Sequence, residues 1–134
     1  MKATLITLIA ICASIFTGCT TPVAIDPLTG QEQVAEYRAG FFHASLDAPI
    51  GQIFKTSNRE LDKLGYLRTG ELHKNNIITI YARKVGDEQI KVRISQQTDA
   101  EGESQPGIRI RIRVGYLGNL AESQVIYARI RDAL

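Results

Sequence analysis

The sequence predicts an α+β fold: a two-layer sandwich in which a mainly antiparallel sheet of about five strands carries two helices on one face. Apolar and polar residues alternate through several short segments, and two longer segments repeat apolar residues at helical spacing. The expected order is a strand, a helix, four strands and a helix. Short turns between the later strands favour antiparallel pairing, and clean alternation indicates one covered face and one wet face.

The first predicted strand and helix are adjacent in the sequence. Phe42, Ala44 and Leu46 alternate with polar residues, as in a strand with one buried face. Asp47-Ala48-Pro49 then predicts a helix start, with Asp47 as the capping carboxylate and Pro49 in the first turn. Gly65 is expected to end this helix in the left-handed conformation. Its apolar stripe consists of Ile50, Ile53, Phe54, Leu61 and Leu64.

The second half predicts four strands, a polar loop and a closing helix. The helix is expected from about Leu120 to Ala133, where Asn119 and Glu122 resemble a capping box. The loop covers Thr98 to Gly107. The expected strands are Tyr66 to Lys74, Ile77 to Val85, Gln89 to Gln97 and Ile108 to Gly115.

The chain is expected to have three regions. Residues 1–18 form a signal peptide of the lipoprotein type, residues 19–35 a lipidated cysteine with a flexible tether, and residues 36–134 a single α+β domain. One cation precedes an apolar stretch that is shorter than the 20 or so residues needed to span a bilayer. A tether of about 15 residues reaches roughly 20 Å, so the domain is expected close to a membrane.

The leader ends in a short motif. Phe16-Thr17-Gly18-Cys19 resembles the lipobox of bacterial lipoproteins, although Phe16 replaces the usual leucine. The resemblance implies acyl chains, such as palmitate, on Cys19, and Thr20 after the cysteine implies passage to the outer membrane. The only other cysteine, Cys12, belongs to the predicted leader, so the domain itself lacks thiol nucleophiles and thiolate metal ligands.

Most of the chain is similar to a known family. The lipobox and three further segments resemble a family of small Gram-negative bacterial lipoproteins that is classified as a domain of unknown function. The resemblance implies a lipoprotein with this order of elements, and it implies no activity and no site. The three segments are Tyr37-Arg38-Ala39-Gly40, Leu46-Asp47-Ala48-Pro49-Ile50 and Arg113-Val114-Gly115.

Basic residues line one side of two predicted strands. Arg109, Arg111 and Arg113 alternate with apolar residues, and Lys91 and Arg93 do so on the preceding strand. Guanidinium groups suit phosphate and carboxylate oxygens, so this candidate contact face could bind lipid headgroups, lipopolysaccharide, peptidoglycan carboxylates or an acidic protein. The alternative is a solvated face that acids such as Glu71 and Glu88 partly neutralise.

Several reaction classes lack the residues that they need. His43 and His73 are the only histidines, and neither has acidic or cysteine neighbours at ligand spacing, so we expect no metal and no cofactor. His43, Ser45 and Asp47 share one side of a strand, which does not orient them as a catalytic relay requires, and no catalytic residue is expected. Sixteen basic against 14 acidic residues give a charge of +2, which implies no strong polyanion partner. Nucleic acid is not expected, because an exported protein does not meet it and few aromatic residues lie between the charges.

The sequence therefore predicts a non-enzymatic, membrane-anchored lipoprotein of the cell envelope, on the outer membrane and facing the periplasm, that acts as an interaction or structural module. Its expected partners are the membrane, through acyl chains on Cys19, and an anionic envelope component or a protein. The alternative is a small-ligand or lipid-binding module with a cavity between sheet and helices.

Overall fold

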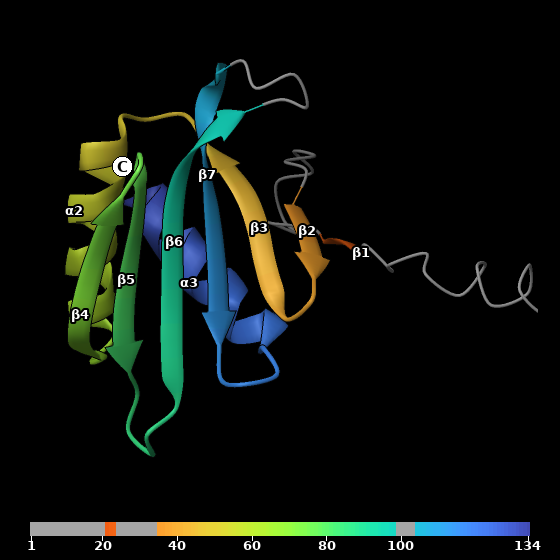
Figure 1. Ribbon diagram of the computed structural model, residues 1–134. Coiled ribbons are helices and arrows are strands. Elements are labelled where there is room, and N and C mark those ends of the chain that lie inside the picture. The colour runs from red at the N-terminus through yellow and green to blue at the C-terminus, as the bar shows by residue number, and fades with distance from the viewer. Residues whose placement is uncertain (1–20, 24–34, 99–103) are drawn as a thin grey trace, which may run out of the picture.

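A computed structural model describes residues 21–23, 35–98 and 104–134 of the chain, and Figure 1 shows their arrangement. The described strands form one antiparallel sheet of seven strands in the order β1-β2-β3-β7-β6-β5-β4. The helices are α2 (Ile50–Lys63) and α3 (Leu120–Asp132). The strands are β1 (Thr21–Val23), β2 (Ala35–Arg38), β3 (Phe41–Leu46), β4 (Leu67–Lys74), β5 (Ile77–Arg83), β6 (Gln89–Thr98) and β7 (Ser104–Val114).

The predicted α+β class is correct, but the five-strand sandwich is wrong, because the sheet has seven strands. The additional strands β1 and β2 have three and four residues, too few for a convincing alternation, and β1 lies within the stretch predicted as tether. A two-residue turn joins β2 to β3, with Ala39 and Gly40 at φ values of 52° and 76°. Positive φ at both positions is the hairpin geometry that glycine and asparagine favour. Because an alanine occupies the first position, the sequence does not indicate a turn there. In addition, β7 begins at Ser104, inside the predicted loop.

Both helices lie on the same face of the sheet, behind the strands as seen in Figure 1. Alternate residues of the central strands point toward them and are fully buried, among them Phe42, Ile112 and Val92. Tyr127 of α3 packs on Phe42 with ring centroids 5.3 Å apart, and its hydroxyl donates to the Ser45 carbonyl at 3.1 Å. The core therefore occupies one side of the sheet and leaves the other side, the open face, uncovered by helices.

The predicted helix ends are confirmed at two places and wrong at a third. At the end of α2, Gly65 has a φ of 77°, and the Tyr66 N–H donates to the Leu61 carbonyl at 3.0 Å, as a left-handed helix end requires. The Asn119 side chain caps α3 by accepting from the Glu122 N–H at 3.2 Å. The prediction that Asp47 caps α2 is wrong. Pro49 is the N-cap residue, and no side chain bonds to this helix start.

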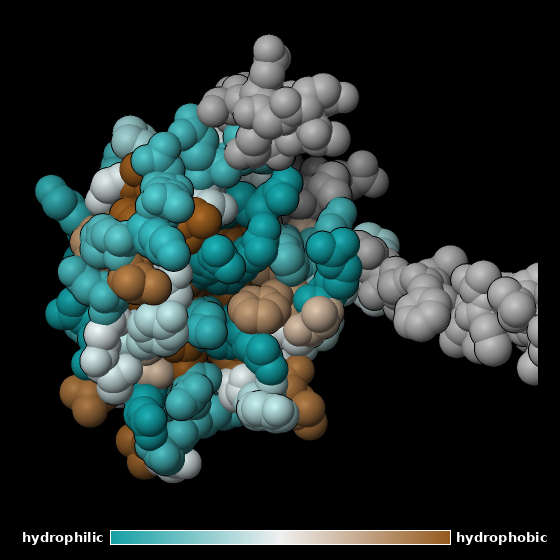
Figure 2. All heavy atoms as spheres, in the orientation of Figure 1, coloured by the Kyte–Doolittle hydropathy of each residue, from teal (hydrophilic) through white to brown (hydrophobic). Residues whose placement is uncertain are grey.

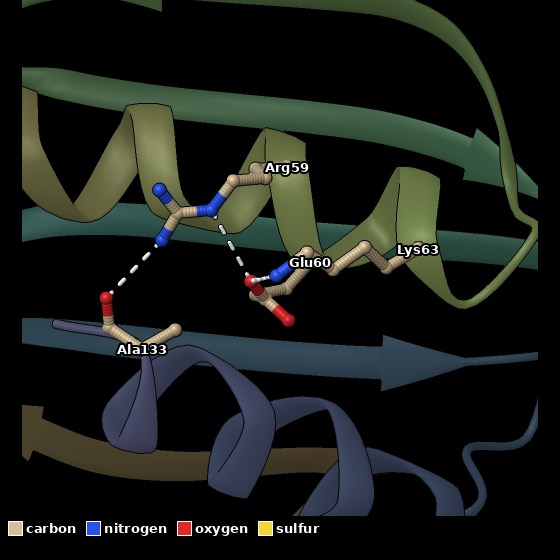
Figure 3. Close-up of polar contacts among 4 residues, drawn as sticks. All are labelled: Arg59, Glu60, Lys63 and Ala133. Carbon is tan, nitrogen blue, oxygen red and sulfur yellow. Dashed lines mark hydrogen bonds and ion pairs between the residues drawn. The ribbon is translucent and has the colours of Figure 1, made fainter.

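A buried carboxylate in α2 pairs with a cation that contacts the end of α3 (Figure 3). The Glu60 side chain is 4% exposed and accepts from Lys63 Nζ at 2.8 Å and from Arg59 Nε at 3.3 Å. The Lys63 hydrogen bond, with help from Arg59, lowers the pKa of Glu60 although burial opposes the shift. Arg59 also donates to the Ala133 carbonyl at 3.1 Å, where α3 ends and its dipole favours a cation.

Gly118, between β7 and α3, is expected not to tolerate a side chain. Its φ is 91°, and an added Cβ would lie 2.2 Å from the Gly40 carbonyl oxygen and 2.5 Å from the Tyr37 hydroxyl. We expect Gly118→Ala to lower the free energy of unfolding by about 2 kcal/mol or more, measured by chemical denaturation. The matched control is Gly51→Ala in α2, where no atom lies within 4 Å of the new Cβ. It should raise stability by about 0.5–1 kcal/mol. Equal stability of both variants would contradict the tight contact.

Candidate functional site

The five basic residues predicted as a contact face lie together on the open face. Arg109, Arg111 and Arg113 project from β7, whose alternate residues Ile110, Ile112 and Val114 are buried in the core. The register places Arg93 of β6 directly opposite Arg111, and Lys91 directly opposite Arg113. Figure 2 shows this side of the molecule, where hydrophilic residues cover much of the surface.

Like charges therefore face each other across β6 and β7. Opposite residues of an antiparallel pair lie about 5 Å apart, and like charges in such pairs are destabilising. Within the part of the chain that the structure describes, none of these five cations forms an ion pair with a carboxylate. These five cations therefore have no ion pair with a described acid, and Glu36, which the register places on the same face, is two strands away from Arg111.

The two acids expected to neutralise this face lie elsewhere. Glu71 pairs in register with the buried Ile80, which puts it on the helix side of the sheet, where it lies 3.4 Å from His73. Glu88 follows the β5–β6 turn, and its charge acts on Lys84 and Tyr66. The alternative of a face neutralised by these acids therefore finds no support in the register.

The open face contains a polar hollow of about 330 Å³ around Arg111. Three further residues with ionisable side chains line it, and the sequence did not single them out as site residues: Arg38, His43 and Glu36. They belong to β2 and β3, and Glu36, His43 and Arg111 follow one another across three strands in the register. The complete lining is Glu36, Arg38, His43, Ala44, Ser45, Gln97, Arg109 and Arg111.

Two members of the arginine ladder, the row Arg109, Arg111 and Arg113 on β7, retain unused hydrogen-bonding capacity. The Nε atoms of Arg111 and Arg113 are buried and have no hydrogen-bond partner among the described residues. Burial and the charges of Arg93, Arg109 and Arg38 lower the pKa of Arg111, which means that its charged form is held at a cost. An oxyanion in the hollow would lie beside Arg111, accept hydrogen bonds from its guanidinium group and offset the repulsion among the surrounding cations.

Aromatic rings contact the cations at the end of the sheet where β6 begins and β7 ends. The Arg113 guanidinium lies 5.1 Å from the Phe41 ring centroid and 5.8 Å from that of Tyr116, and Lys91 Nζ lies 5.4 Å from the Tyr81 ring. Such contacts fix long side chains while leaving their charges available.

Lys84, by contrast, belongs to a separate paired cluster. Glu122 of α3 accepts from Lys84 Nζ and from the Tyr66 hydroxyl, both at 2.8 Å. Burial and this hydrogen bond raise the pKa of Tyr66 to about 12, so the phenol stays protonated. The contacts satisfy the carboxylate and connect α3 to the β5–β6 turn and to the start of β4, which is a structural role.

A second hollow, of about 570 Å³, lies beside the start of α2 and the β4–β5 turn. Ile50, Ile78 and Ile108 contribute apolar walls, and His73 and Gln96 contribute polar groups. His73 also packs edge-on against Phe54 of α2, with centroids 5.2 Å apart. No group of three or more metal-ligating side chains is present in the described ranges, and no helix there is long and apolar enough to cross a bilayer.

Comparison with protein families identifies the group to which the sequence is related. Residues 2–133 match the family described as "Protein of unknown function (DUF3568)". The chain belongs to this family. No curated protein matches the sequence. The expected resemblance to a family of unknown function is therefore confirmed, and membership in DUF3568 assigns no activity and no site to the basic face.

His43 offers a direct probe of the hollow in this DUF3568 protein. Burial, together with Arg111 and Arg38, lowers the pKa of His43 from its ordinary value of 6.5. The unfolded chain therefore binds more protons than the folded chain between the two pKa values, so stability falls as the pH drops through 6.5 toward the lower value. We expect an NMR titration to place the pKa of His43 below 6.5, and Arg111→Gln to raise it.

The matched control for this titration is Arg129→Gln, since Arg129 is exposed on α3 and away from the open face. His43→Gln identifies the signal, because His73 is the only other histidine. A pKa of His43 at or above 6.5, or one that Arg111→Gln leaves unchanged, would contradict the described electrostatics of the hollow.

Proposed function

We propose that this protein is a non-enzymatic, lipid-anchored module of the cell envelope that binds an anionic envelope component through its open face. The observation that carries the proposal is the pairing of cation against cation across β6 and β7, without a described carboxylate to compensate it. A sheet face with only a solvation role has no reason to keep opposed charges that lower stability. A ligand with several anionic oxygens supplies that reason.

The chemistry of the hollow narrows the class of ligand. Arg38, Arg109 and Arg111 surround it, and guanidinium forks bind phosphate and carboxylate oxygens in pairs. Ser45 adds a hydroxyl, which donates to Gln97 Oε1 at 3.3 Å. Glu36 is the one carboxylate among the described residues that line the hollow, so a ligand that also presents a hydroxyl or amine donor fits better than a bare anion. Phosphorylated or carboxylated envelope glycans have this combination of groups.

The anchor is the second part of the proposal. The predictions of a signal peptide, a lipobox and an acylated Cys19 concern residues 1–20, which lie outside the described residues. The proposed outer-membrane location facing the periplasm depends on the same residues. Their support is the resemblance of Phe16-Thr17-Gly18-Cys19 to the lipobox. Several acyl chains give far more stable anchoring than one, since each buried methylene adds about 0.8 kcal/mol.

Mass spectrometry of the full chain, recovered from the membranes of an expressing Gram-negative bacterium, tests the anchor. We expect residues 1–18 to be absent and Cys19 to carry acyl chains. Cys12→Ala should be processed in the same way, whereas Cys19→Ala should be neither cleaved there nor acylated. An unmodified Cys19 in a chain that retains Met1 would refute the proposed anchor.

Charge reversal tests the open face. We expect Arg109→Glu with Arg111→Glu to weaken co-sedimentation with purified peptidoglycan sacculi or lipopolysaccharide at least tenfold, because each charge-assisted contact contributes about 1.5–3 kcal/mol. Wild-type binding should also weaken as the salt concentration rises.

The matched control for that variant is Lys55→Glu with Arg129→Glu, which changes the net charge equally on exposed helix positions. It should bind like wild type. Circular dichroism establishes that both variants fold. Equal binding by a folded open-face variant would show that the basic face is not a contact surface.

A small-ligand or lipid-binding module is the second candidate, and the 570 Å³ hollow beside the start of α2 favours it. The space between sheet and helices is elsewhere filled by fully buried side chains such as Phe42, Ile53 and Tyr127. A ligand there would therefore be confined to the end of the sheet, where His73 and Gln96 could hold a polar group.

A further inference from the structure

Four chain connections meet at one end of the sheet, which we call the loop end. Arg83 pairs with Leu67 and with Gln89, so the β5–β6 turn lies beside the start of β4. The Gly115 N–H donates to the Gln89 carbonyl at 2.7 Å, which places the β7–α3 connection next to that turn. The β2–β3 turn lies against Gly118. In Figure 1 the loop end is the lower edge of the sheet.

Large apolar side chains project into solvent at the loop end. Val85 is 93% exposed, Tyr116 88%, Leu117 83% and Leu67 71%. The two other exposed large hydrophobics of the described residues, Leu72 and Val125, are each only 50% exposed. Figure 2 shows hydrophobic spheres protruding along the lower margin of the molecule. Clustered exposed apolar groups mark a contact surface, whereas single ones need no explanation.

The chain also enters the sheet at this end. Thr21, the first residue of β1, pairs with Tyr37, whose neighbour Arg38 pairs with Phe41 at the β2–β3 turn. Cys19 precedes Thr21 by two residues, and two residues span at most about 7 Å. Acyl chains on Cys19 would thus begin beside the loop end and not at the opposite end of the sheet.

On the open face, cations lie next to the exposed apolar groups of the loop end. Arg113 stacks on Tyr116 and on Phe41, and Lys91 lies opposite Arg113 in the register. Arg38 continues the same row across the sheet. Apolar and aromatic tips with a row of cations behind them match the layers of a bilayer, where acyl chains give way to anionic headgroups.

We propose that the loop end docks on the bilayer that holds the acyl chains of Cys19. Val85, Tyr116 and Leu117 enter the headgroup region, and Arg38, Arg113 and Lys91 contact anionic headgroups. The identity of the bilayer rests on the proposed function, while the loop-end contact itself rests on exposed side chains and their register. The β4–β5 turn, with Asn75 and Asn76, then points away from the membrane.

Single tryptophans test this orientation, because the chain contains none. We place the mature acylated chain, recovered from membranes, in nanodiscs of phosphatidylcholine and phosphatidylglycerol with brominated acyl chains, which quench nearby indoles. Leu117→Trp should show blue-shifted emission and at least threefold stronger quenching than Asn76→Trp. Val85→Trp, at another exposed tip, is a second reporter if Leu117→Trp fails to fold.

Equal quenching at the loop end and at position 76 would overturn the inference, even when mass spectrometry finds Cys19 acylated and the proposed function stands. A chain without acyl chains would contradict the proposed anchor instead. In that case, adding the same Leu117→Trp chain to vesicles of the same lipids still tests the loop end, and an absence of quenching overturns the inference.

Discussion

The period of two along β6 and β7 determines what each face of this protein can do. Ile90, Val92 and Ile94 of β6 and the matching residues of β7 are fully buried under the helices. The residues between them must therefore point the other way, and these are lysine and arginine. A slip of one residue would bury the arginine ladder in the core, so the hydrophobic layer holds the charges in place.

Charge is divided between the two sides of the sheet. On the helix side, Glu60 pairs with Lys63 of the same helix and Glu122 pairs with Lys84, both at 2.8 Å, and the second contact connects α3 to the β5–β6 turn. On the open face, the cations of β6 and β7 have no described carboxylate within ion-pair distance. Glu60 and Glu122 thus stabilise the protein's own fold, while the cations of β6 and β7 remain available for another molecule.

The sequence predicts those elements whose periodicity is long enough to be unambiguous. Asn119 caps α3, Gly65 ends α2, and the ladder from Ile108 to Val114 lies within β7 as expected. The sequence does not predict the short edge strands β1 and β2, because three or four residues are too few to show a periodic pattern. Asp47 fails as a cap because Pro49 already starts the helix, so a good capping residue alone does not fix a helix boundary.

Periodicity also decides which residues of the candidate site could be predicted from the sequence. The five predicted cations share a strand period and could be found from β6 and β7 alone. Arg38 and His43 could not, because they join Arg111 only through the pairing of β2 with β3 and of β3 with β7. Such pairing depends on a hairpin turn whose first residue is alanine at positive φ, which sequence rules assign to glycine or asparagine.

The two proposed surfaces constrain each other through the arginine ladder. Successive ladder residues lie about 7 Å apart along β7, so Arg109 stands about 14 Å farther from the loop end than Arg113. In the proposed orientation Arg113 lies at the headgroups, whereas Arg109 and the hollow around Arg111 face the space beside the membrane. An anionic partner in the envelope would then reach the hollow from the side, and Arg38, which lines the hollow and also continues the row of Arg113, is a cation that both surfaces would share.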